Sequence, residues 1–190
     1  MNKNRLEAFS DGVLAIIITI MVLEIRVPQG TEFSDLIPLL PVILSYILSF
    51  VFLGIYWNNH HHLLHTITKV SGSILWANLH LLFWLSLVPF VTSWMGENSF
   101  SPKPVALYGV ILLMAALAYY ILQSRILKSH GKDSVLAKAI GKDIKGKISP
   151  VLYILGIASS WVNTWIAGGF YVLVALIWLI PDKRIERNMG

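Results

Sequence analysis

Charge-free apolar stretches constrain the fold of this chain more than any other feature of its sequence. Residues 36–59, 70–96 and 104–124 contain no Asp, Glu, Lys or Arg. Each is long enough to cross the roughly 30 Å hydrocarbon core of a bilayer, which takes roughly 20 apolar residues. Charged residues make up 13% of the chain, against about 25% in soluble domains. We therefore expect an integral membrane protein, which excludes a soluble domain, a disordered chain and a nucleic-acid-binding module.

A fourth charge-free stretch, residues 148–181, is too long for one transmembrane helix. It has 34 residues, and at about 1.5 Å per residue a single helix would reach roughly 50 Å. The pair Gly168-Gly169, which follows the polar residues Asn163 and Thr164, indicates an interruption. We therefore expect two short helices in this stretch.

The N-terminal apolar segment is less regular than the others. Residues 13–23 are mostly apolar, and the acidic residues Glu7 and Asp11 precede them. These acidic residues, and the lack of an A-x-A cleavage site, argue against a signal peptide, so we expect a retained first span. The sequence thus predicts an all-α, polytopic membrane protein with a single domain over residues 1–190 and six spans, at about residues 6–26, 37–59, 72–94, 104–125, 150–163 and 167–181.

The distribution of Lys and Arg predicts the orientation of these spans. With six spans, thirteen of the 15 basic residues fall on one side, and Arg26 and Lys103 fall on the other. Short cytoplasmic loops of membrane proteins are enriched in Lys and Arg. We therefore expect both termini to lie in the cytoplasm and the chain to be a multi-pass protein of the cell inner membrane.

The formal charge of +5 does not indicate nucleic-acid binding, because the basic residues lie between apolar blocks. Residues 125–147 carry seven Lys and Arg residues. This segment allows two interpretations: a surface that binds anionic lipid, or a solvated cytoplasmic connector.

A helical projection of the first span separates an apolar stripe from two polar residues. At about 100° per residue, six residues lie within roughly 60° of a line through Ile16, and with Ile16 they form the first-helix stripe: Arg5, Phe9, Gly12, Thr19, Ile20 and Leu23. Asp11 lies about 140° from that line, and Ser10 about 120° from it on the other side. Because polar groups inside a membrane are costly, Ser10 and Asp11 need protein partners.

The first-helix stripe allows two interpretations. It is typical of ordinary packing between membrane helices. It is also typical of a pore wall, in which rings of bulky apolar side chains gate by dewetting and the hydroxyl of Thr19 supplies oxygen ligands. The pattern alone does not separate the two.

Polar residues in the third span are candidate partners for the first. His80 lies some way inside its span and is the expected partner of Asp11. A hydrogen bond between them would leave no unsatisfied polar group in a low dielectric. Asn78 and the indole N–H of Trp76 are further candidate donors.

The motif Arg5-x-x-x-Phe9-Ser10-Asp11 at the head of the first span resembles the RxxxFSD signature of the lysosomal-type potassium channel family. Three further stretches also resemble this family, so that the resemblance covers most of the chain: residues 56–60 (YWxxH), 76–80 (WxNxH) and 87–90 (LxPF). The channels of this family lack a TVGYG filter, and none occurs here. Its bacterial members have one six-helix unit per subunit, as expected for this chain.

The resemblance implies a homotetramer in the lipid bilayer, whose first helices line a central pore that conducts potassium without a cofactor. It implies that Ile16 forms the main hydrophobic constriction, with Ile20 and Leu23 on successive turns above it, and that Thr19 forms a hydroxyl ring tied to potassium preference. It also implies a structural network around the first helix, in which Ser10 and Asp11 act through His80 and Trp76: Arg5, Phe9, Ser10, Asp11, Trp76, Asn78 and His80.

Two other function classes remain open from the residues. A membrane metalloenzyme could use the histidines of residues 60–65, where His61 and His65 share one helical face. However, no second histidine cluster and no adjacent carboxylate accompany them. A proton-coupled or ion-coupled transporter would show inverted repeats or helices broken near the midplane, and its only acidic candidates are Asp11 and Glu24. We expect a channel rather than an enzyme.

Overall fold

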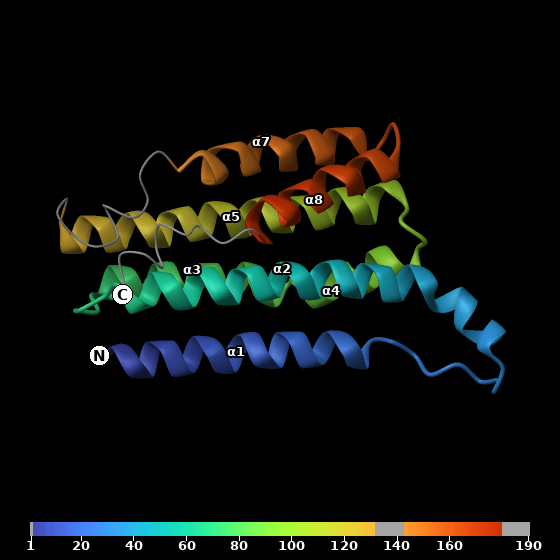
Figure 1. Ribbon diagram of the computed structural model, residues 1–190, viewed down its shortest axis with the longest axis horizontal. Coiled ribbons are helices and arrows are strands. Elements are labelled where there is room, and N and C mark those ends of the chain that lie inside the picture. The colour runs from blue at the N-terminus through green and yellow to red at the C-terminus, as the bar shows by residue number, and fades with distance from the viewer. Residues whose placement is uncertain (1, 132–142, 180–190) are drawn as a thin grey trace.

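The computed structural model describes residues 2–131 and 143–179, and these residues form helices and connecting segments with no strand. The elements in chain order are α1 (Lys3–Leu23), the 3-10 helix η1 (Phe33–Leu39), α2 (Leu40–His65), α3 (Gly72–Ser86), α4 (Val88–Glu97), α5 (Pro102–His130), α7 (Ile144–Ser159) and α8 (Thr164–Leu179). The long helices run roughly parallel to one another. Helix α1 lies along one edge of the bundle and α7 along the opposite edge (Figure 1).

Four helical segments are long and apolar enough to cross a membrane: Lys3–Leu23, Phe33–His65, Gly72–Glu97 and Pro102–His130. The chain therefore has the all-α membrane fold class that the sequence predicts. Helices α7 and α8 have 16 residues each. At about 1.5 Å per residue each is roughly 24 Å long, somewhat less than the hydrocarbon thickness.

The third apolar segment is divided into α3 and α4 at Leu87, which ends one helix and begins the other. Pro89 lies in the first turn of α4. Proline has no N–H to donate and disfavours helical geometry in the residue before it, so a helix usually ends near this point. The sequence predicts one uninterrupted span at residues 72–94, so the division at Leu87 differs from that expectation.

The interruption between α7 and α8 lies earlier than the sequence predicts. Asn163 accepts a hydrogen bond from the backbone N–H of Trp165 at 2.8 Å and caps the start of α8. Asparagine is a favoured N-cap residue. The expected break at Gly168-Gly169 is therefore wrong, because both glycines lie inside α8.

Glycine permits a close three-helix junction at Tyr171. This residue of α8 is 1% exposed, and its hydroxyl donates to the carbonyl of Val105 on α5 at 3.1 Å. A Cβ at Gly109 of α5 or Gly156 of α7 would overlap the Tyr171 side chain. Small residues let membrane helices approach closely, so these two glycines hold α5, α7 and α8 together around one ring.

Candidate functional site: the first helix

Helix α1 has one buried face and one uncovered face. The residues that are buried against α2, α3 and α4 recur every three or four positions: Leu6, Ser10, Leu14, Ile17 and Met21. The first-helix stripe lies on the other face, where Ile16 is 58% exposed, Ile20 42% and Leu23 80%. Figure 1 shows α1 at the rim of the bundle. A single chain thus leaves the bulky side of this helix largely uncovered.

A buried hydrogen-bond chain holds the other face of α1. The side-chain amide of Asn78 on α3 donates to Ser10 Oγ at 3.0 Å, and Ser10 Oγ donates to the carbonyl of Leu6 at 2.9 Å. The Asn78 carbonyl accepts from Nε2 of His60 on α2 at 2.7 Å. Ser10 and Asn78 are 0% exposed and His60 is 2% exposed. Because each group in this chain is paired inside the bundle, the contacts fix the rotation of α1 against α2 and α3.

Asp11 supplies a second link between α1 and α2. The indole N–H of Trp57 donates to Asp11 Oδ1 at 3.1 Å. Trp57 in turn stacks on His61 of its own helix, with ring centroids 6.3 Å apart and an interplanar angle of 29°. The Asp11 carboxylate is thus directed toward α2 and away from the first-helix stripe.

The expected contact between Asp11 and His80 is wrong. Nε2 of His80 accepts instead from the indole N–H of Trp84, one turn along α3, at 3.0 Å. Trp76 is 75% exposed and makes no hydrogen bond to α1 in the described residues. The reason is helical phase: His80 is about 200° from Asn78 around α3, so the two cannot both face α1.

Trp57, the partner of Asp11, and His60, the partner of Asn78, are not among the residues that the sequence predicts for this network. A signal for His60 was present, because it shares one face of α2 with the buried residues Leu53, Tyr56 and Leu64. A polar residue on a buried face of a membrane helix needs a partner. Of the other expected network residues, Arg5 and Phe9 lie on the uncovered face of α1, where Phe9 is 51% exposed.

Thr19 lies on the uncovered face with its proton directed to the helix backbone. Its Oγ1 donates to the carbonyls of Ala15 at 3.0 Å and Ile16 at 2.9 Å. A hydroxyl oxygen has two lone pairs besides its O–H donor. In this arrangement the lone pairs remain available on the exposed side of α1.

An open groove of about 620 Å³ runs between α1 and α4. Ile16 and Ile20 form part of one wall, and Phe90 and Trp94 form part of the other. The end of the groove beside the C-terminus of α1 is polar. There Ser93 Oγ donates to Glu24 at 3.4 Å, and Arg26 pairs with Glu97 at 3.3 Å.

The histidines of residues 60–65 are not part of a group of three or more His, Cys, Asp or Glu residues that could hold a metal ion, and the described part of the chain contains no such group. His60 is already bonded to Asn78. The rings of His61 and His65 lie 6.2 Å apart, centroid to centroid. Lys3 donates to the carbonyl of His65 at 3.0 Å and pairs with Glu7 at 3.7 Å, which ties the start of α1 to the end of α2.

Comparison with known proteins gives consistent matches over this region and beyond it. A family model described as endosomal/lysosomal potassium channel TMEM175 matches residues 5–89. A protein named a potassium channel, from Chryseobacterium sp. (strain P1-3), is 60% identical over 189 residues, covering 100% of this chain and 98% of that protein. A potassium channel of Chamaesiphon minutus is 30% identical and is covered over 94% of each chain. A crystal structure described as a lysosomal potassium-selective channel TMEM175 homolog from Chamaesiphon minutus has a TM-score of 0.81 at 30% identity, covering 95% of this chain and 97% of that chain.

Proposed function

This chain belongs to the TMEM175 family of endosomal/lysosomal potassium channels, and we propose that it is a potassium channel whose subunits assemble with their α1 helices around a central pore. The family is one of channels rather than enzymes. The expected family and the all-α membrane fold are thereby confirmed.

The assignment of the pore to α1 rests on the contrast between the two faces of this helix. The buried face of this helix is fixed by the Ser10–Asn78–His60 chain, while its other face presents large apolar side chains without a neighbour. A helix that is rigidly oriented on one side is suited to aim the opposite side at a shared axis. Four copies arranged about that axis, a homotetramer, would cover the first-helix stripe and make it the wall of the pore.

The proposed constriction is a ring of Ile16 side chains, with Ile20 and Leu23 on the turns that follow. Isoleucine and leucine offer no oxygen to replace the hydration shell of an ion. A narrow ring of such residues therefore expels water and blocks ions until it widens. Asp11 is directed toward Trp57 on α2, so its charge lies off this path.

Thr19 is the proposed source of potassium preference. Its proton is engaged by the backbone of α1, so its oxygen presents lone pairs rather than a hydrogen atom to the pore. A ring of four such oxygens favours a cation over an anion. Potassium is the permeant ion, and no cofactor is required.

We further propose six spans per subunit, with η1–α2 and α3–α4 each counted as one. In this topology both termini lie in the cytoplasm and the protein resides in the cell inner membrane. The basic segment at residues 125–147 then faces the anionic leaflet, where it is suited to contact anionic lipid. Residues 132–142 of that segment lie outside the described residues.

Potassium flux from liposomes tests the channel against the coupled transporter. Purified protein is reconstituted into potassium-loaded vesicles, and efflux is followed with a protonophore present to balance charge. We expect efflux down the potassium gradient without ATP or another coupling ion. Efflux that depends strictly on ATP or on a counter-ion gradient would contradict a passive channel. Protein-free vesicles are the control for leakage.

A further inference from the structure

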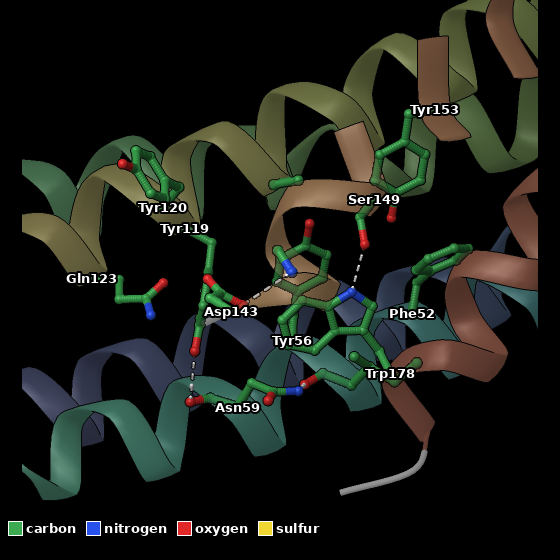
Figure 2. Close-up of a pocket in the computed structure, with 13 residues that line it drawn as sticks. Phe52, Tyr56, Asn59, Tyr119, Tyr120, Gln123, Asp143, Ser149, Tyr153 and Trp178 are labelled. Atoms are coloured by element: carbon green, nitrogen blue, oxygen red, sulfur yellow. Dashed lines mark hydrogen bonds between the residues drawn. The ribbon is translucent and has the colours of Figure 1, made fainter. Parts of the chain in front are cut away.

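A separate cavity lies between α2, α5, α7 and α8, and no residue of α1 lines it (Figure 2). It holds about 50 Å³ of space. At roughly 10–15 Å³ per water molecule, this is room for about four waters or for one compact organic ion. None of its lining residues belongs to the first-helix stripe or to the Ser10–Asn78–His60 chain.

Aromatic side chains form a large part of the cavity wall. Six of them line it, contributed by all four helices: Phe52, Tyr56, Tyr119, Tyr120, Tyr153 and Trp178. Two of these rings are held by hydrogen bonds, drawn as dashed lines in Figure 2: Trp178 donates to Ser149 Oγ at 2.8 Å, and Tyr119 donates to the carbonyl of Asn59 at 3.2 Å. The rings of Tyr119 and Trp178 meet edge to face, with centroids 6.5 Å apart. The wall is therefore built in a fixed arrangement.

Asp143 contributes a carboxylate to the same wall. Its Oδ1 accepts from the backbone N–H of Gly146 at 3.0 Å and caps the start of α7. Asp143 holds a left-handed backbone conformation, with φ 33° and ψ 57°, which Asp tolerates better than most residues. Within residues 2–131 and 143–179 its Oδ2 has no hydrogen-bond or ion-pair partner.

Two tyrosine hydroxyls also lack partners among the described residues. Tyr56 is 9% exposed and Tyr153 is 2% exposed, and neither hydroxyl makes a hydrogen bond. No enclosed side-chain oxygen or nitrogen in the described part of the chain is without a partner, so these two hydroxyls must border open space. Both residues line the cavity.

We propose that this cavity binds a small organic ammonium ion, with its charge against the Asp143 carboxylate and its alkyl groups against the surrounding rings. Aromatic faces attract alkylammonium ions through their quadrupole, and this attraction strengthens where water is excluded. The carboxylate disfavours an anion, and an uncharged apolar molecule would leave the Asp143 oxygen unpaired. A bare divalent metal ion needs several oxygen ligands, and the described residues bring no such group together here.

Calorimetric titration of the purified protein with tetramethylammonium tests this proposal. The comparison ligand is tert-butanol, an uncharged molecule with the same number of heavy atoms. We expect saturable binding of tetramethylammonium and no binding of tert-butanol at equal concentration. Absence of saturable tetramethylammonium binding to the wild-type protein would overturn the proposal.

The substitution Asp143→Asn identifies the site of binding. Asparagine is as good an N-cap as aspartate, so α7 keeps its start and the lost charge is the main change. We expect the affinity for tetramethylammonium to fall roughly tenfold or more, as for loss of a charge-assisted contact. The matched control is Asp35→Asn, another helix-capping carboxylate, which should leave the affinity unchanged. Equal affinities of wild type and Asp143→Asn would overturn the proposal.

A second variant displaces the carboxylate without removing it. A Cβ at Gly146 would lie 2.5 Å from Asp143 Oδ2, so Gly146→Ala should also weaken binding. The pore variants Ile16→Ala and Thr19→Val test whether the ion binds in the conduction path instead. Unchanged affinity in these two variants supports the cavity, and lost affinity in either would place the ion in the pore and overturn the proposal.

The ammonium group could come from a free amine or from the headgroup of a zwitterionic lipid. Titration in nanodiscs of phosphatidylglycerol alone, and in nanodiscs containing phosphatidylethanolamine, distinguishes these sources. A lower apparent affinity for tetramethylammonium in the second supports a lipid headgroup that competes for the cavity. Equal affinities that still depend on Asp143 support a free amine.

Discussion

Trp57 of α2 donates its indole N–H to Asp11 of α1 at 3.1 Å. Asp11 lies near the start of the helix that we assign to the pore, yet its carboxylate is directed at a neighbouring helix. The Asp11–Trp57 contact and the Ser10–Asn78–His60 chain lie on different sides of α1. Together they restrain the helix against rotation about its own axis.

The Asp11–Trp57 contact predicts a structural role for Asp11. Asp11→Asn keeps an oxygen that can accept from Trp57 but loses the charge, so we expect a lower yield of folded tetramer with little change in potassium preference. Trp57→Phe removes the hydrogen-bond donor and should lower the yield of folded tetramer to a similar extent. Size-exclusion chromatography and reversal potentials measure the two properties. A well-assembled Asp11→Asn channel without potassium preference would show that the carboxylate acts on the ion instead.

The buried hydrogen-bond chain through Asn78 predicts a larger loss of stability on substitution than the Asp11–Trp57 contact does. Asn78→Ala leaves His60 Nε2 without its partner and removes the donor to Ser10 Oγ, which keeps its bond to the carbonyl of Leu6. An unsatisfied buried group costs about 1–3 kcal/mol. We expect a clear fall in the midpoint of thermal unfolding, measured in detergent. The exposed Ser86, which among the described residues bonds only its own helix backbone, gives the matched control Ser86→Ala. Equal midpoints for Asn78→Ala and Ser86→Ala would contradict the assigned role of the chain.

The junction around Tyr171 predicts opposite effects for two glycines of the C-terminal helices. Gly156→Ala places a methyl group against the Tyr171 ring and should destabilise the fold by about 1–3 kcal/mol. Gly168 in α8 has open space where a Cβ would lie, so Gly168→Ala should be neutral or stabilise by up to about 1 kcal/mol. Thermal unfolding of both variants checks the pair, and a stable Gly156→Ala protein would refute the close packing.

The exposed hydroxyl of Thr19 predicts a selectivity effect that spares the current. Thr19→Val keeps the shape of the side chain and removes its oxygen, so potassium preference over sodium should fall while conductance persists. Thr164→Val, at the start of α8, is the matched control and should change neither property. Reversal potentials under a potassium/sodium gradient give the measurement. An unchanged preference in Thr19→Val would remove Thr19 from the ion path.

The sequence predicts the orientation of α1 well because a helix has a fixed angular period. The stripe obtained by stepping 100° per residue coincides with the uncovered face, and Ser10 lies on the buried face as expected. The partners of Ser10 and Asp11 were harder to predict. Imidazole suits a carboxylate, so residue chemistry favours His80, but contact depends on which face of α3 meets α1, and Asn78 lies on that face.

The helix boundaries are likewise predicted only in part from the sequence. Charge-free length predicts the long apolar segments, because the bilayer thickness sets it. The division at Leu87 and the break at Asn163 depend on the local effects of single residues, Pro89 and Asn163. Charge-free length and the positions of glycines, on which the predicted boundaries rest, do not reveal these effects. The aromatic cavity was not foreseen, because its wall combines residues from four helices that only the packed structure brings together.

Single-channel recording of Ile16→Asn tests the central claim, that the first-helix stripe is the wall of the pore. Replacing a ring of isoleucines by amides supplies groups that hold water, so the dewetting barrier should fall. Ile154→Asn is the matched control: Ile154 on α7 is 55% exposed, close to the 58% of Ile16, but lies on the opposite edge of the bundle. We predict a several-fold rise in potassium current for Ile16→Asn and wild-type current for Ile154→Asn. Wild-type current in both assembled variants would place the ion path elsewhere.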